Sequence, residues 1–227
     1  WPSESARLLG PGLENAPAQE AHVAIARLLK ALGDRHSFLQ SAADAAEQTA
    51  DAVASHAPVT RVSGGIGYLR VPGLRGTNEA AGTRFSVEFC DALTQGAADA
   101  PQGWIVDLRG NSGGNMWPML AGLRPLLGDG PTGSFRDSAG QVTPWSSKPD
   151  ATCTAPLAAS PVAVLIGPAT ASSGEAVAMA FKGRANTRFF GQTTAGVATS
   201  NRGFPLPDGS VLMLTTAVFL DRSGLAY

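Results

Sequence analysis

Two short runs of apolar residues, at 103–108 (GWIVDL) and 161–166 (PVAVLI), constrain the fold more than any other feature. Continuous apolar runs of this length predict strands that are buried on both faces of a sheet. Further elements surround them: helices are predicted at 78–95, 115–127 and 172–182, and shorter strands at 66–71 and 187–190. Alternating strands and helices predict an α/β fold with parallel strands.

A helical segment precedes this alternating pattern. Apolar residues recur at mainly helical spacing over 18–32, and Gly33 follows where a helix C-terminal cap is expected. An alanine-rich stretch at 42–55 predicts a second helix with one solvated face. We therefore expect a small N-terminal helical segment at 1–60 and an α/β core domain at 61–227.

Composition excludes several classes of partner. The chain of 227 residues has 17 basic and 18 acidic side chains, so its net charge of −1 argues against a nucleic-acid or anionic-membrane surface. The longest apolar runs are too short to span a bilayer. Because the chain begins at Trp1 rather than at a methionine, a removed signal or anchor is compatible with the sequence.

Few residues are suited to bind metal. Only two cysteines, Cys90 and Cys153, are present, and each is expected to be an isolated thiol, with a single disulfide as the alternative. The three histidines, at 22, 36 and 56, are scattered and lack the spacing of a zinc hydrolase. We therefore expect no metal and no cofactor.

Two loops that follow the apolar strands are candidates for the chemistry. The first, at 107–115 (DLRGNSGGN), brings the pair Gly113-Gly114 to the start of a helix, where free backbone N–H groups could face an anion. A phosphate site, an oxyanion hole and a plain tight turn all fit this pattern. The loop lacks the Lys-Ser/Thr ending of a P-loop.

The second loop, at 167–175 (GPATASSGE), places Ser172 near the N-terminus of a predicted helix. The helix dipole there favours negative charge beside the serine, which suits a nucleophile. However, Ser172 and Glu175 also fit a helix capping box. A nucleophile needs a base, and His36 is the candidate because it follows a helix stop, whereas Lys182 is too far along the same helix. A surface histidine is the alternative reading of His36.

These segments together resemble the S41 peptidase family, the carboxyl-terminal-processing and tricorn-type serine proteases. The resemblance lies in Asp34-Arg35-His36-Ser37, in the strand and glycine loop at 104–114, and in the nucleophile segment at 170–175. The last is most similar to the nisin-resistance-type form, and two downstream segments, at 191–196 and 206–209, also fit. The resemblance implies a crotonase/ClpP-like ββα core with parallel strands.

Carried onto this chain, the resemblance makes Ser172 the nucleophile, His36 its general base and Glu175 the group that supports the histidine. The N–H groups of Gly113 or Gly114 and of Ser173 would form the oxyanion hole. One departure matters, because Val197 stands where Ser-Lys processing proteases carry a lysine, so a Ser-His-Glu arrangement is required. Activity should then fall below about pH 6, where a histidine becomes protonated.

The implied function is a serine endopeptidase of C-terminal-processing type. Its substrate would be a peptide or an unstructured protein C-terminus, and its location extracytoplasmic, in the periplasm or cell envelope. No PDZ-like insert fits between His36 and the strand at 66–71. The main alternative is a non-catalytic peptide-binding domain on the same scaffold, in which Ser172 is only a helix cap. An acyl-CoA-handling enzyme of crotonase type and a metal hydrolase fit less well.

Overall fold

The structure is a computed structural model that describes residues 16–49, 53–54, 59–145 and 156–227. These residues divide into two compact units. Unit 1 comprises the described residues up to Glu47 together with Asn201–Thr216. Unit 2 comprises the described residues of Gln48–Ser200 together with Ala217–Tyr227.

A five-stranded sheet forms the centre of unit 2. Its strands lie in the order β10 (Thr187–Gly191), β9 (Val162–Ile166), β6 (Gly103–Asp107), β4 (Ile66–Arg70) and β3 (Val59–Ser63). The first four strands run parallel, and β3 is antiparallel to β4. Leu69, Val106 and Val164 lie in register across the sheet and are fully buried, which fixes its core face.

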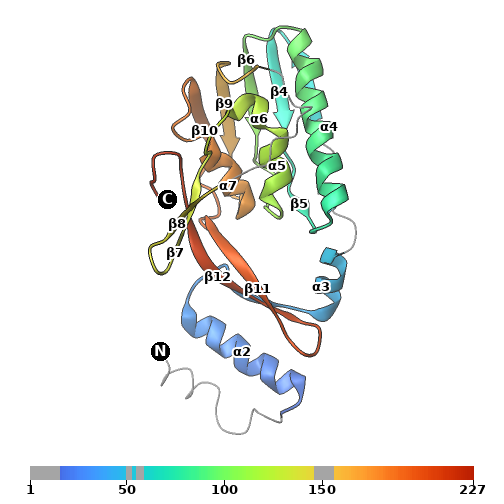
Figure 1. The fold of residues 1–227 in the computed structure, drawn as a ribbon, viewed down its shortest axis with the longest axis vertical. Helices are drawn as coiled ribbons and strands as arrows, with labels where there is room; N and C mark the ends of the chain where they lie inside the picture. Colours follow the sequence, from blue (N-terminus) through green and yellow to red (C-terminus); the bar gives the residue numbers. More distant parts are fainter. Residues whose placement is uncertain (1–15, 50–52, 55–58, 146–155) are drawn as a thin grey trace. The chain divides into compact units, whose positions relative to one another are not determined.

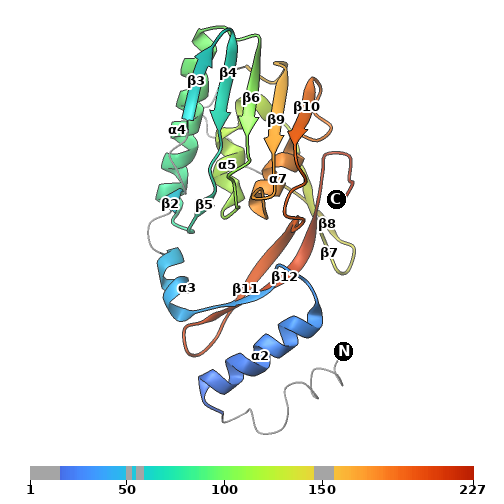
Figure 2. The same cartoon turned by 180° about the vertical axis from the view of Figure 1, so that it is seen from behind.

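The helices of unit 2 cover one face of this sheet. They are α4 (Glu79–Ala98), α5 (Met116–Gly122), α6 (Arg124–Leu127) and α7 (Ser173–Ala180). Figure 1 shows them in front of the strands, and Figure 2, from behind, shows the strands in front of the helices. Their buried side chains form the core together with the inner face of the sheet. The predicted α/β fold with parallel strands is confirmed.

Three details differ from the sequence-based expectation. The strand at 161–166 is not buried on both faces, because Ala163 and Leu165 are half-exposed and helices cover only one side. The helix expected at 115–127 breaks at Leu123, because Pro125 has no N–H to continue the helical hydrogen bonds and lies instead in the first turn of a new helix. The helix expected at 42–55 ends at Thr49, and the short strand β2 (Val53–Ala54) pairs with β5 (Leu74–Arg75).

Unit 2 also contains a smaller set of antiparallel strands beside its central sheet. The hairpin of β7 (Ser134–Asp137) and β8 (Val142–Pro144) pairs with the last residues of β12 (Val211–Leu220) through β7. Tilted and edge-on contacts among aromatic rings fill this region, namely Trp117, Phe135, Trp145 and Phe219.

Cys90, on α4, corrects one expectation. Its side chain is buried and disulfide-bonded, so it is not an isolated thiol. The only other cysteine of the chain, Cys153, lies outside the described residues.

Unit 1 combines one amphipathic helix with short strands. Helix α2 (Ala18–Leu32) ends as predicted at Gly33, which adopts a left-handed conformation and donates its N–H to the carbonyl of Leu29. Strand β1 (Phe38–Gln40) pairs with the start of β12, β11 (Thr199–Pro205) also pairs with β12, and α3 (Ala42–Thr49) follows β1. In the described part of the chain, no helix has both the length and the apolar character needed to cross a membrane.

Candidate active site

Two loops meet at the carboxyl ends of the neighbouring parallel strands β6 and β9, as expected for an open α/β sheet. Asn111 joins them: its backbone carbonyl accepts a hydrogen bond of 3.0 Å from the N–H of Ala171. Its fully buried side chain accepts from the N–H of Gly113 at 2.9 Å. The hydroxyl of Thr170, also fully buried, donates to the carbonyl of Leu108 at 2.8 Å. Sequence reasoning did not single out Asn111 or Thr170, although both hold the loops together.

Ser172 lies at a sharp turn between β9 and α7. Its backbone has φ 52° and ψ −120°, a conformation that a residue with a side chain rarely adopts. Strain of this kind costs about 1–3 kcal/mol and is concentrated at functional sites. Sharp turns from a strand into a helix expose the nucleophile in many hydrolases. Ser172 is half-buried, so its side chain is accessible at this turn.

The glycines around Ser172 permit close approach of the two loops. A Cβ atom on Gly113 would lie 3.0 Å from the Cβ of Ser172 and 2.8 Å from the carbonyl oxygen of Ala171. A Cβ atom on Gly174 would lie 2.3 Å from the carbonyl oxygen of Asn111. Both glycines are therefore required by the contact between the loops.

The expected oxyanion hole consists of the N–H of Gly113 or Gly114 together with that of Ser173. That of Gly113 is occupied, since it donates to the side chain of Asn111. Those of Gly114 and Ser173 have no hydrogen-bond partner among the described residues. The Ser173 hydroxyl donates to the carbonyl of Gly114, which holds these two residues side by side. Gly114 and Ser173 are thus the pair of donors that remain available.

Glu175 is buried, and its carboxylate accepts four hydrogen bonds within unit 2. The capping box is present, with the N–H of Ser172 donating to Oε2 at 2.9 Å. The N–H of Val197 donates to the same oxygen at 2.9 Å. The other oxygen, Oε1, accepts from the N–H of Gly196 at 2.8 Å and from the hydroxyl of Thr194 at 2.6 Å. Glu175 therefore ties the loop at 194–197 to the backbone of Ser172.

A second buried carboxylate fixes the start of the glycine loop. Asp107, at the end of β6, binds the guanidinium of Arg109 at 2.7 and 3.0 Å and the hydroxyl of Tyr68 at 2.7 Å. Burial raises the pKa of Asp107, but the hydrogen bonds from Arg109 and Tyr68 outweigh it and hold that pKa below its ordinary value. The hydrogen bonds from Arg109 to Asp107 in turn raise the pKa of the guanidinium.

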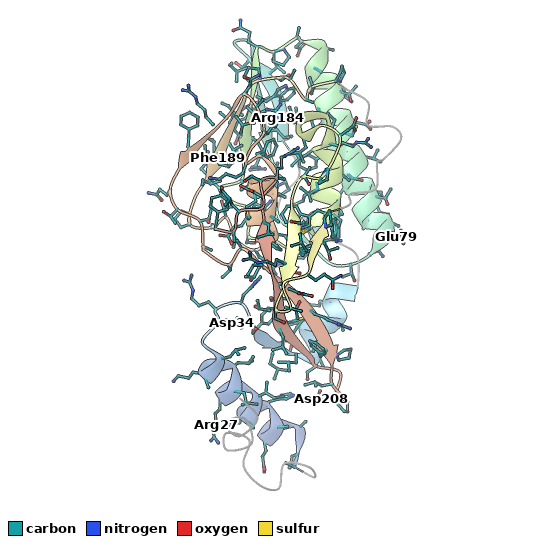
Figure 3. All side chains as sticks on the ribbon, turned by 60° about the vertical axis from the view of Figure 1, so that its left-hand side comes forward. Arg27, Asp34, Glu79, Arg184, Phe189 and Asp208 are labelled. Carbon is teal, nitrogen blue, oxygen red and sulfur yellow. The ribbon has the colours of Figure 1, made fainter. Side chains whose placement is uncertain are left out.

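His36 lies in unit 1, in the half-buried loop between α2 and β1, whereas the other expected site residues lie in unit 2. Asp34, labelled in Figure 3, shapes this loop by accepting hydrogen bonds from the N–H of His36 at 2.8 Å and from the hydroxyl of Ser37 at 2.6 Å. Burial raises the pKa of Asp34, yet the hydrogen bonds from Ser37, His36 and Thr215 hold it below its ordinary value.

The other histidines and lysines that the structure describes have surroundings different from those of His36. His22 is half-buried in unit 1 and pairs with Asp208 at 2.7 Å. The ammonium of Lys182 lies over the rings of Phe189 and Tyr227, 4.9 and 4.6 Å from their centres. His56 and Lys148 lie outside the described residues. Among the described residues, no group of three His, Cys, Asp or Glu side chains is arranged to hold a metal ion.

Known proteins resemble this chain in sequence and structure. The nisin-resistance protein of Lactococcus lactis subsp. lactis is 30% identical over 212 residues, which are 88% of this chain and 64% of that protein. The carboxy-terminal processing protease CtpA of Bacillus subtilis is 28% identical over 140 residues, 60% of this chain and 28% of that protein. The chain thus spans less than two thirds of the length of either relative.

A solved structure of a lipoprotein from Streptococcus agalactiae is similar to this chain, with a TM-score of 0.85 and 27% sequence identity. The match covers 99% of this chain and 79% of the lipoprotein chain. Residues 65–226 match the sequence pattern that defines peptidase family S41. That match covers the parallel strands of the central sheet, the glycine loop and the Ser172 turn, and the chain therefore belongs to peptidase family S41.

Proposed function

We propose that this chain is a serine peptidase in which Ser172 attacks the carbonyl carbon of a peptide bond. The observation that carries the proposal is the backbone of Ser172, held at φ 52° at the start of α7 between two loops in a chain of family S41. Strain of this kind persists only where the surrounding structure enforces it, and here Gly113, Gly174 and Glu175 do so.

His36 is the proposed general base. It would accept the proton of the Ser172 hydroxyl as the serine oxygen bonds to the carbonyl carbon, and then deliver that proton to the leaving amine. Water would attack the resulting ester, with His36 accepting its proton, to release the acid and restore Ser172. Val197 provides no amine at the position of the processing-protease lysine, which supports histidine as the base.

The oxyanion of the tetrahedral intermediate would be bound by the N–H groups of Gly114 and Ser173. Neither group has a hydrogen-bond partner in the part of the chain that the structure describes, which supports this assignment, and the N-terminus of α7 adds a favourable dipole. Gly113 would contribute through its lack of a side chain, because its own N–H is committed to Asn111.

Glu175 would support the site without touching the substrate. The resemblance assigns it to the histidine, and its hydrogen bonds support a role exerted through the backbone of Ser172 and the loop at 194–197. A carboxylate offers about four lone-pair positions, and the four donors in unit 2 match that number.

The proposed substrate is a peptide, cleaved near its C-terminus, and the proposed location is outside the cytoplasm at the cell envelope. The names of two relatives, a nisin-resistance protein and a lipoprotein, support that location. The disulfide at Cys90 supports it independently, because disulfides persist in oxidising compartments.

Peptide cleavage tests this proposal. Paired synthetic peptides with free and amidated C-termini are incubated with the wild-type chain and with Ser172→Ala, and the products are read by mass spectrometry. We expect cleavage by the wild type alone, favouring the free carboxylate. Equal cleavage of both peptides would contradict only the C-terminal preference. Peptide binding without cleavage by either protein would instead support a non-catalytic binding domain, with Ser172 as a helix cap.

A further inference from the structure

Strands β11 and β12, from the C-terminal part of the chain, form hydrogen bonds with the loop that contains His36. Asn201, on β11, donates a hydrogen bond of 2.6 Å from its side-chain Nδ2 to the backbone carbonyl of His36. On the other side of the same residue, the N–H of His36 donates to Asp34. All three residues belong to unit 1, so this contact is internal to one compact part of the molecule.

These two hydrogen bonds act on the two peptide groups that flank the Cα atom of His36. Because peptide groups are planar, fixing both of them fixes the two soft backbone dihedrals of the residue between them. The direction of the bond from Cα to the imidazole-bearing Cβ is then set by the backbone. Asn201 and Asp34 therefore set the direction of the Cα–Cβ bond of His36 through its backbone.

Thr215, on β12, orients Asn201 for this task. Its hydroxyl oxygen lies 3.2 Å from Oδ1 of Asn201 and 3.3 Å from Oδ1 of Asp34, where a hydroxyl can donate. With Oδ1 facing a donor, the amide presents its NH₂ end to the carbonyl of His36. The N–H of Thr215 also donates to the hydroxyl of Ser37 at 2.9 Å, so β12 supports the residue that follows His36.

We propose that Asn201 is a positioning residue that sets the direction of His36 for proton transfer. The inference rests on the proposed function, in which His36 is the base. A general base must lie within about 2.6–3.2 Å of the atom whose proton it accepts. Displacement of a reacting group by about 1 Å can slow a reaction about 100-fold. Loss of the Asn201 bond removes one restraint on the peptide group after His36, to which the hydrogen bond from the N–H of Ser37 to Asp34 also contributes, and permits such a displacement.

The test is the rate of serine modification by a fluorophosphonate probe, measured over a range of probe concentrations. For Asn201→Ala we expect the maximal rate to fall by about 10- to 100-fold, with the half-saturating probe concentration unchanged. Asn201→Asp keeps the shape of the side chain but places an oxygen against the carbonyl of His36. Its maximal rate should therefore fall by as much as that of Asn201→Ala. A merely structural role would not separate the two kinetic parameters.

Thr215 supplies the second pair of variants, which decides the question if Asn201→Ala does not fold. Thr215→Val removes the hydroxyl that orients Asn201 and should lower the maximal rate, whereas Thr215→Ser retains the hydroxyl and should recover it. Equal maximal rates in Thr215→Val and wild type would contradict the inference.

Asp208→Asn is the matched control, because it weakens a different contact of unit 1, the pair with His22. It should lower the thermal midpoint without changing the maximal rate. An equal fall in rate in Asp208→Asn would show general loosening of unit 1 and overturn the inference, as would a wild-type rate in Asn201→Ala. If His36→Ala itself reacts like wild type, the proposed function fails instead, so the two failures are distinguishable.

Discussion

At the scale of single residues, the candidate site depends on backbone geometry as much as on reactive side chains. Ser172 is held in a conformation that costs free energy, and Gly113 faces it where no side chain fits. The candidate residues Ser172 and Glu175 could be predicted from sequence because they lie on one short turn with a known pattern. Asn111 and Asn201 could not, because each joins the site to a residue far along the chain, Pro72 and His36 respectively, and an isolated asparagine has no distinctive spacing.

Gly113→Ala tests the importance of this close approach. The new methyl would meet the carbonyl of Ala171 at 2.8 Å and Ser172 at 3.0 Å, at a φ of +100°. We expect a loss of about 1–3 kcal/mol in the free energy of unfolding, measured by urea denaturation, and slower modification of Ser172. Gly110→Ala is the control, since its Cβ would meet nothing within 4 Å. Equal effects of the two substitutions would refute the steric argument.

At the scale of elements, parallel strands bring the two loops together at one edge of the sheet. Their order and type could be predicted from the apolar runs and the helical spacing between them. The short strands β1 and β11 could not, because each forms through pairing with β12 rather than through a pattern of its own. Pro125 is a local signal for the break at Leu123, but the helical spacing of the surrounding leucines favoured one continuous helix instead.

The end of β6 gives a prediction about acid stability. Because the folded state holds the pKa of Asp107 below its ordinary value, the ionised carboxylate stabilises the fold above the unfolded-state pKa of about 3.9. That stabilisation is lost as the pH falls through the lower pKa of the folded state. Asp107→Asn should therefore be less stable than wild type at pH 7, with a gap that narrows below about pH 4.

Urea denaturation between pH 3 and pH 7 measures this gap. Asp129→Asn removes an exposed ion pair with Arg124 and should change the free energy of unfolding by less than about 1 kcal/mol. A constant difference between wild type and Asp107→Asn across this range would contradict the prediction.

At the scale of the whole molecule, the expected catalytic residues are divided between two units of the chain. Ser172 and Glu175 lie in unit 2 and His36 in unit 1, to which the hairpin residues 201–216 also belong. Local periodicity cannot predict that residues 201–216 belong to the same unit as the N-terminal segment, because the two are far apart in the chain. Family resemblance supplied the pairing of His36 with Ser172, because both motifs occur in the same order in S41 peptidases.

The disulfide at Cys90 makes stability depend on redox conditions. Removing a native disulfide typically costs about 2–4 kcal/mol. Incubation with dithiothreitol should therefore lower the thermal midpoint of the wild type by several degrees, measured by circular dichroism. Cys90→Ser should have a lower thermal midpoint than the wild type before reduction, and dithiothreitol should not change that midpoint. A wild-type midpoint that is insensitive to full reduction would contradict this.

Intact mass after exposure to a fluorophosphonate probe tests the central claim most directly. We expect a single adduct on the wild-type chain and none on Ser172→Ala or His36→Ala, which would identify Ser172 as an activated nucleophile and His36 as its base. Folded wild-type protein that forms no adduct would contradict the account. So would an adduct that persists at the wild-type rate in His36→Ala.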